Sequence, residues 1–221
     1  MSGPTGVAPD GSPVALYRKL PGDAEAAFIK SLIGERAPVL ELGAGAGRIT
    51  RHLASARHAA TAVDNGADML ACLRDIDGVE TVLSDIESLN LSPRRWPVVL
   101  LASHLINIAA GPELLAAAVR HTAVGGDVLV QRHEPGWIDN VTESVSRRPD
   151  LVIEMQDIQH PRDGFMTATM IYDIDGDRFA QPFEAYEVDD DRLHALAAEV
   201  NCEVVEILGA HRKWIRLRRR N

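Results

Sequence analysis

The sequence predicts an α/β fold in which a seven-stranded, mostly parallel sheet carries helices on both faces, with a small antiparallel insertion over the carboxyl ends of its strands. Short apolar runs alternate with amphipathic helical patterns over residues 37–131, as is typical of a parallel sheet between helices. Glycines at alternate positions follow the first apolar run. Residues 150–188 show strands and turns without helices, which indicates an antiparallel unit.

The first half of the chain is predicted element by element. A helix begins near Asp23, which suits a helix cap, and places Ala24, Phe28 and Leu32 on one face. Hydrophobic periodicity then predicts strand 37–42, helix 48–57, strand 59–64, helix 67–74, strand 80–84, strand 97–102, helix 112–122 and strand 126–131.

After residue 134 the pattern changes. Strands are expected at 151–158, 166–174 and 178–188, with hairpin turn chemistry at 173–177, then a helix at 190–200 and closing strands at 203–208 and 212–218. We expect a single domain over residues 1–221. Its first 13 residues are rich in Gly, Pro and Ser, so we expect them to be flexible or ordered only over a bound ligand.

Gly43, Gly45 and Gly47 lie between the first strand and the next helix. Glycines at such a turn let a ligand approach the backbone closely, and a helix N-terminus offers free N–H groups. A dinucleotide fingerprint would need a third glycine at position 48, which is Arg48, and the acidic Glu41 would repel a pyrophosphate but suit an α-amino group. The segment therefore predicts a site for a nucleotide-like molecule that carries an amino group.

The pattern Glu41-x-Gly43-x-Gly45-x-Gly47 resembles motif I of the class I S-adenosylmethionine-dependent methyltransferases. Four further segments resemble the family's later strands in the expected order: 62–70, 83–87, 98–103 and 124–130. The resemblance as a whole runs from about residue 17 to residue 218. The resemblance implies a Rossmann-like sheet whose last strand is antiparallel. It also implies S-adenosylmethionine as cofactor and S-adenosylhomocysteine as product.

The resemblance assigns cofactor contacts to particular positions. Glu41 would bind the amino group, Asp64 the ribose hydroxyls, and Asp85 and the Ile86 backbone the adenine. The full set expected at the cofactor is Tyr17, Glu41, Gly43, Ala44, Gly45, Gly47, Asp64, Asn65, Met69, Asp85, Ile86 and Ser103. Simpler roles stay open: a tight turn for the glycines, helix caps for the two aspartates, and core packing for Met69 and Tyr17.

Candidate catalytic residues follow the fourth and fifth strands. His104 and His133 could each accept a proton from the methyl acceptor, or could merely support their loops. Candidate substrate contacts are Arg132, Trp137, Tyr172 and Tyr186, although strand packing is the favoured alternative for the tyrosines. Because neighbouring strand residues face opposite sides, Arg132 and His133 cannot both line one pocket in a regular strand.

Composition limits the partners. The formal charge of −9 argues against a nucleic-acid substrate, and no apolar stretch approaches the ~20 residues of a membrane span. Two cysteines without metal-ligand spacing, and an N-terminus without signal-peptide character, indicate a reduced, cytoplasmic protein without a metal. The abundance of arginine and alanine points to a bacterial source. A homodimer is compatible with the sequence.

The sequence therefore predicts an enzyme that methylates an O or N atom of a small, aromatic or heteroaromatic metabolite. Two other classes stay open. A non-catalytic cofactor-binding protein would keep the same fold, and a nicotinamide-dependent oxidoreductase is disfavoured by Arg48 at the glycine position.

Overall fold

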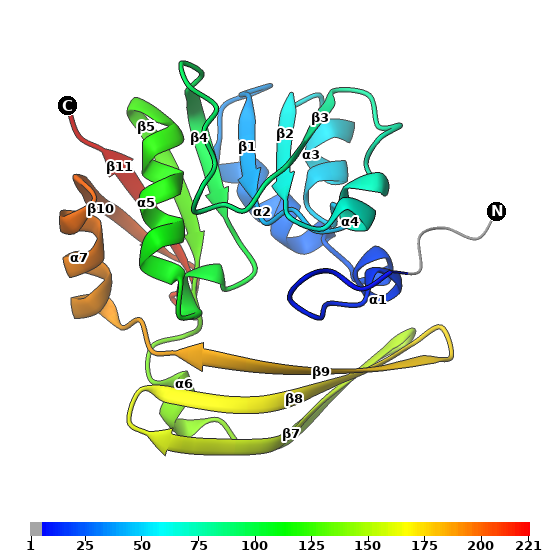
Figure 1. Cartoon of the computed structure of the whole chain (residues 1–221). Coiled ribbons are helices and arrows are strands. Elements are labelled where there is room, and N and C mark those ends of the chain that lie inside the picture. The colour runs from blue at the N-terminus through cyan, green and yellow to red at the C-terminus, as the bar shows by residue number, and fades with distance from the viewer. Residues whose placement is uncertain (1–5) are drawn as a thin grey trace.

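The computed structural model describes residues 6–221. A seven-stranded sheet with helices on both faces lies above a separate four-stranded antiparallel sheet (Figure 1). The predicted α/β architecture is therefore confirmed. Of the predicted flexible segment, residues 1–5 lie outside the described residues, and residues 6–13 form a closed loop in which Val7 bridges Pro13.

The first part of the chain builds five strands of the large sheet and most of its helices. These elements are α1 (Val14–Lys19), α2 (Asp23–Leu32), β1 (Val39–Leu42), α3 (Thr50–Ser55), β2 (Ala60–Asp64), α4 (Ala67–Ala71), β3 (Val79–Leu83), β4 (Trp96–Leu101), η1 (Leu105–Asn107), α5 (Gly111–His121) and β5 (Thr122–Gln131).

The second part builds the smaller sheet and then returns to the large one. Its elements are α6 (Trp137–Asn140), β6 (Ser144–Arg148), β7 (Leu151–Arg162), β8 (Phe165–Ile174), β9 (Asp177–Tyr186), α7 (Asp190–Glu199), β10 (Cys202–Leu208) and β11 (Trp214–Arg219). We call the four strands β6 to β9 the cover sheet.

The large sheet has the strand order β10-β11-β5-β4-β1-β2-β3. Strands β1 to β5 are parallel, and β11 is antiparallel to both of its neighbours, as predicted for the last strand. The order reverses between β1 and β4, and ligands of open α/β sheets bind at the carboxyl ends of strands around such a switch point.

Both faces of the large sheet are buried, which explains its continuous apolar runs. Along β4, Val99 and Leu101 pack into a cluster with residues of α5 and α7, whereas Val98 and Leu100 pack with residues of α2 and α3. Strand β4 therefore contributes alternate side chains to two cores, and the centre of the sheet is a rigid platform for the loops at its carboxyl edge.

The cover sheet lies below the carboxyl ends of the parallel strands (Figure 1). It is a meander with the order β6-β7-β8-β9, and its inner side chains form clusters around Met166 with Ile138 and around Leu151 with Ile174. Leu16 of α1 is fully buried in the second of these clusters. The N-terminal helix is therefore packed on the cover sheet.

Several boundaries differ from the sequence prediction. The helix predicted from residue 48 begins at Thr50, and the strand predicted from residue 126 begins at Thr122. Strand β6 was not predicted because all five of its residues, Ser-Val-Ser-Arg-Arg, are exposed and show no apolar alternation. Helix α1 was also missed, since it is one and a half turns long and follows Pro13 in a segment of turn-forming composition.

Candidate functional site

A cavity of about 240 Å³ opens at the carboxyl ends of β1, β2 and β4. The predicted cofactor residues that line it are Tyr17, Glu41, Gly43, Ala44, Gly45, Asp64, Asn65, Met69, Ile86 and Ser103. Residues that the sequence analysis did not assign complete the wall, among them Ala8, Asp10, Ser12, Arg48, Ser84, Glu87 and Leu105. The fold therefore brings nearly all of the predicted cofactor residues to one cavity.

The glycine loop adopts a backbone that side chains disfavour. Gly43, Gly45 and Gly47 have φ values of 68°, 56° and 80°. A methyl group added to Gly47 would lie 2.1 Å from a Leu73 methyl carbon, so this glycine allows close packing of the loop. A methyl group on Gly45 would meet only the Tyr17 ring, at 3.7 Å, so Gly45 opens toward the cavity.

Glu41 is buried beneath the glycine loop at the end of β1 and lines the cavity. One carboxyl oxygen accepts a hydrogen bond from Thr50 Oγ1 at 2.5 Å. Burial raises the pKa of Glu41 to about 7, although the Thr50 hydrogen bond and the charge of Arg48 oppose the shift. A cation bound beside Glu41 would favour its ionised form, so this carboxyl suits an ammonium group.

Arg48 supplies the opposite charge in the same part of the cavity. Its guanidinium donates hydrogen bonds to Glu25 Oε1 at 2.8 Å and to Ser103 Oγ at 3.1 Å. Glu41 and Arg48 both line the cavity, and the charge of Arg48 affects the pKa of Glu41, so the two groups are close together. Such a pair suits the end group of an amino acid, because the acid can bind its ammonium group and the guanidinium its carboxylate.

Asp64 ends β2 and joins the glycine loop to the following turn. Its two carboxyl oxygens accept hydrogen bonds from the backbone N–H groups of Gly45, at 2.7 Å, and of Gly66, at 2.8 Å. Burial raises the pKa of Asp64, and these two bonds act in the opposite direction. The carboxylate therefore orders the loop while it lines the cavity beside Asn65.

Asp85 is the one predicted adenine contact that does not line the cavity, whereas its neighbours Ser84 and Ile86 do. Its side chain is exposed and accepts a hydrogen bond from Asn65 Nδ2 at 2.9 Å. Met69 is 2% exposed and packs with Ala8 and other small side chains on the N-terminal side of the cavity. Met69 and Ile86 give this end of the cavity an apolar wall.

The loop after β4 is strained. Ser103 and His104 both have left-handed backbones, with φ values of 55° and 59°, which side chains other than glycine rarely adopt. The loop is held in place by Gln131 at the end of β5, whose Oε1 accepts a hydrogen bond from the Ser103 N–H at 2.8 Å. Strain of this kind gathers at functional sites, where surrounding contacts maintain it.

His104, His133 and Trp137 form a stack beside this loop. The His104 and His133 ring centroids are 4.0 Å apart at an interplanar angle of 5°, and those of His133 and Trp137 are 4.2 Å apart at 10°. The stack brings together both predicted bases and one predicted substrate contact. Among the described residues, His104 Nδ1 is a buried nitrogen without a hydrogen-bond partner.

Both histidines are weak bases in this setting. Burial lowers the pKa of His104 to about 4, and the nearby Lys213 and Arg48 charges add to the shift. Burial also lowers the pKa of His133 to about 2, with further contributions from His104 and Lys213. Both rings are therefore neutral at neutral pH, and the surroundings of the stack disfavour added positive charge.

Arg132 is held by hydrogen bonds to the protein itself. It is fully buried and donates hydrogen bonds to the Val188 carbonyl at 2.8 Å, the Arg212 carbonyl at 3.2 Å and Asp190 Oδ1 at 2.5 Å. These contacts join β5 to the segment before α7 and to the β10–β11 turn. Arg132 points into this junction and has a structural role there, and its contact with substrate stays a prediction.

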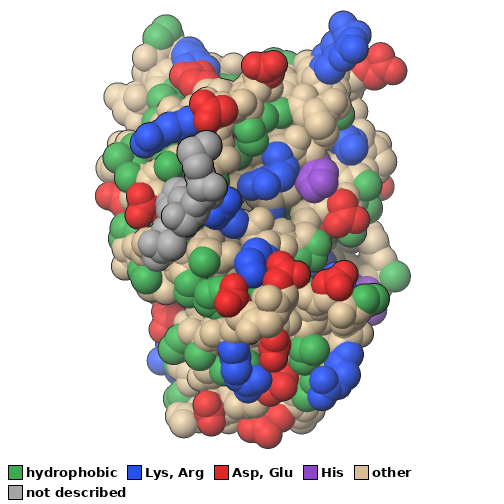
Figure 2. Space-filling model, turned by 90° about the vertical axis from the view of Figure 1, so that its right-hand side faces the viewer, with side chains coloured by type: hydrophobic (Ala, Val, Ile, Leu, Met, Phe, Trp, Pro, Cys, Tyr) green, Lys and Arg blue, Asp and Glu red, His purple; other side chains and the backbone are tan. Residues whose placement is uncertain are grey.

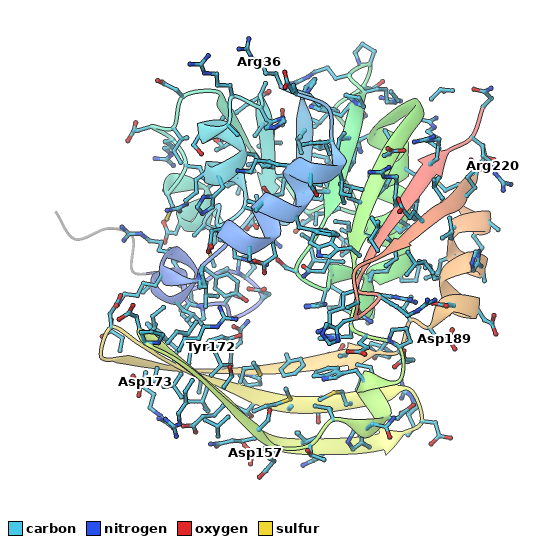
Figure 3. The ribbon with its side chains drawn as sticks, turned by 180° about the vertical axis from the view of Figure 1, so that it is seen from behind. Arg36, Asp157, Tyr172, Asp173, Asp189 and Arg220 are labelled. Carbon is cyan, nitrogen blue, oxygen red and sulfur yellow. The ribbon has the colours of Figure 1, made fainter. Side chains whose placement is uncertain are left out.

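The predicted tyrosines occupy different parts of the cover sheet. Tyr172 lies where β8 meets α1, packed near Leu16 and Tyr17 (Figure 3), and its burial raises its pKa to about 12. Tyr186 packs against Phe165 at 4.7 Å between ring centroids. Its carbonyl accepts a hydrogen bond from Asn107 Nδ2, and Asn107 Oδ1 accepts one from the His133 N–H. Asn107 thus connects the cover sheet with the histidine stack.

Residues 6–221 contain no group of three His, Cys, Asp or Glu side chains that could hold a metal ion. Over the same residues, no helix is long and apolar enough to cross a membrane.

Comparisons with known proteins agree with this geometry. Residues 39–126 match the family described as "Methyltransferase domain". No curated protein matches the chain significantly by sequence.

Several solved structures share the fold over nearly the whole chain. The CcbJ methyltransferase from Streptomyces caelestis is 21% identical, with a TM-score of 0.73 over 94% of this chain and 96% of that one. The sugar N-methyltransferase KedS8 from Streptoalloteichus sp. is 21% identical, with a TM-score of 0.71 over 100% and 99%. The amino pentose methyltransferase CalS10 from Micromonospora echinaspora is 19% identical, with a TM-score of 0.68 over 93% and 95%.

The matched residues 39–126 include the glycine loop and Asp64, which line the cavity. The wider likeness includes the cover sheet, since it extends over more than nine-tenths of both chains. The chain therefore has the fold of these methyltransferase structures, and its residues 39–126 match the methyltransferase-domain family.

Proposed function

We propose that this chain is an enzyme that transfers a methyl group from S-adenosylmethionine to a nitrogen atom of a small molecule. The observation that carries the proposal is the cavity at the switch point of the sheet, where an open glycine loop, a buried acid and a guanidinium lie together. An amino acid end group and a nucleoside fit these residues chemically.

The cofactor would be held by residues at the ends of β1, β2 and β3 and by Met69 of α4. Glu41 would bind its ammonium group and Arg48 its carboxylate, while Asp64 and Asn65 would bind the ribose. Met69 and Ile86 would contact the adenine. The sulfonium supplies the reactive methyl group, so the protein mainly orients the two reactants and excludes water.

The histidine stack supports an amine over a hydroxyl acceptor. A hydroxyl must lose its proton to become a good nucleophile, and neutral histidines with pKa values near 4 and 2 are poor bases for that task. A neutral amine already carries a free lone pair. The burial and cationic neighbours that keep these imidazoles neutral would also favour the neutral form of a bound amine. His104 and His133 would then orient the acceptor.

The size and surroundings of the site support a small acceptor. The aromatic side chains of Trp137, Tyr172 and Tyr186 lie on or beside the cover sheet and could pack on an aromatic ring or on the apolar face of a sugar. Two proteins with this fold are named as a sugar N-methyltransferase and an amino pentose methyltransferase. Acidic and basic side chains are mixed on the face in Figure 2, unlike the basic surface of a nucleic-acid-binding protein.

A paired acceptor screen tests the proposal. The chain is incubated with S-adenosylmethionine and amino sugars, aromatic amines, or the matching hydroxyl compounds, and methylated products are measured by mass spectrometry. We expect methylation of amines and none of the matched alcohols or phenols. Calorimetric titration with S-adenosylhomocysteine, with NAD in parallel, tests the cofactor separately. Binding of NAD without binding of S-adenosylhomocysteine would contradict the proposed cofactor. Methylation confined to hydroxyl groups would contradict the proposed nitrogen acceptor.

A further inference from the structure

The N-terminal segment, residues 6–19, lies between the cofactor cavity and the cover sheet. On one side, Ala8, Asp10, Ser12 and Tyr17 line the cavity. On the other, Leu16 is buried among residues of β7 and β8. Figure 1 shows α1 above the turned end of the β8–β9 hairpin. One short segment therefore contacts the cofactor site and the cover sheet at once.

The loop at residues 6–13 has its own internal order. The Ala8 N–H donates to the Ser12 carbonyl at 2.9 Å, and Asp10 accepts hydrogen bonds from both the N–H and the hydroxyl of Ser12 at 2.9 Å. Because the loop is closed on itself, it can move as a unit about the chain that follows it. Its position over the cavity then depends on the contacts made by Ser12 and Tyr17 and on the packing of Ala8 with Met69.

Gln181 of β9 makes those contacts from the cover sheet. Its Nε2 donates to Ser12 Oγ at 3.0 Å, and its Oε1 accepts from the Tyr17 hydroxyl at 3.2 Å. The Tyr17 ring beside Gly45 is thus fixed by a residue more than 160 positions away in the chain. Lys19 adds an ion pair with Asp177 at 2.8 Å, but both partners are partly exposed, and exposed pairs contribute little.

We propose that Gln181 is a positioning residue that holds Tyr17 and the 6–13 loop closed over the cofactor, and so sets how fast the cofactor leaves. This inference rests on the proposed function, because the retained molecule is S-adenosylmethionine or its product. Ala8, Ser12 and Tyr17 line the cavity that would hold the nucleoside, so opening of the segment would widen its exit. Opening breaks the Gln181 hydrogen bonds, whereas initial binding to the open form does not require them.

The test measures S-adenosylhomocysteine dissociation by stopped-flow competition. Gln181→Ala should release it about 3- to 10-fold faster, the effect expected for the loss of one or two net hydrogen bonds. The association rate should stay within about twofold of that of the unaltered chain, and the melting temperature within about 2 °C. Tyr17→Phe, which keeps the ring but removes the hydroxyl, should also accelerate release. Gln159→Ala is the matched control, since Gln159 is exposed on the same sheet.

Hydrogen exchange gives a second readout that needs no ligand. In Gln181→Ala, amides of residues 6–19 should exchange faster than in the Gln159→Ala control, with the large sheet unchanged. Unchanged dissociation and unchanged exchange in Gln181→Ala would overturn the inference while leaving the proposed function intact. Failure of the unaltered chain to bind S-adenosylhomocysteine would contradict the proposed function, and the exchange experiment would still decide whether Gln181 holds the segment.

Discussion

Glu41 should make cofactor affinity depend on pH. Its carboxyl is buried at the end of β1, and its pKa of about 7 means that half of the free protein carries a protonated Glu41 at neutral pH. An ammonium group of the cofactor requires the ionised form. Binding must therefore remove a proton from the protonated fraction, and the apparent affinity should rise as the pH increases through 7.

The magnitude follows from this linkage. If only ionised Glu41 binds the ligand, the apparent Kd is multiplied by about 11 at pH 6 and by about 1.1 at pH 8, so affinity should improve about tenfold between them. At pH 7 about half a proton should be released per ligand bound. The hydrogen bond from Thr50 lowers the pKa of Glu41. Thr50→Val removes this bond, so the rise in affinity should occur at higher pH in that variant.

Calorimetry with S-adenosylhomocysteine measures both quantities. Titrations from pH 6 to 8, in two buffers of different ionisation enthalpy, give the affinity and the number of protons released. Glu41→Gln should bind more weakly at pH 8 and lose the pH dependence. Glu87→Gln is the control, because Glu87 also lines the cavity but is exposed. Equal affinity at pH 6 and 8 without proton release in the unaltered chain would refute the reasoning.

Three further substitutions test other parts of the site. Arg132→Ala should reduce the free energy of unfolding by about 2–4 kcal/mol in urea titrations, because buried carbonyl groups lose their donor; a loss below about 1 kcal/mol would contradict the structural role. His104→Ala should lower kcat at least about tenfold with the Kd for S-adenosylhomocysteine within about threefold, and an unchanged kcat would remove His104 from the reaction. Gly45→Val should weaken S-adenosylhomocysteine binding more than about 100-fold in calorimetry, since a branched side chain would distort a left-handed loop. The control Gly34→Val, at a glycine in open space, should bind normally. Retained binding in Gly45→Val would contradict the glycine-loop contact.

The sequence predicted the large sheet because its strands are buried on both faces. Continuous apolar runs such as residues 98–101 are typical of strands buried on both faces, and the glycines after β1 mark where the chain must turn. Cofactor residues next to strand ends were predictable for the same reason. Parallel strands bring their carboxyl ends to one edge, so a residue such as Asp64 is placed by its position after a strand.

Residues that act across the fold could not be predicted in this way. Gln181 lies in an ordinary alternating strand, and its partners Ser12 and Tyr17 come from the opposite end of the chain. Arg132 was predicted to contact substrate because it follows a strand at the functional edge, but the acceptors of its hydrogen bonds are supplied by segments far along the sequence. A local pattern shows where a side chain starts and does not show what packs against it.

The weak basicity of the histidine stack and the strain of its loop have a common structural cause. Two consecutive left-handed residues, Ser103 and His104, cost roughly 1–2 kcal/mol each, and this geometry is maintained by Gln131. The resulting turn brings the His104 ring flat against His133, where both lose water contacts and lie near Lys213. A loop adapted for strong base catalysis would place a carboxylate beside the imidazole. Here burial, His104 and Lys213 instead lower the pKa of His133, and in the proposed reaction the same surroundings would favour the uncharged form of a bound amine.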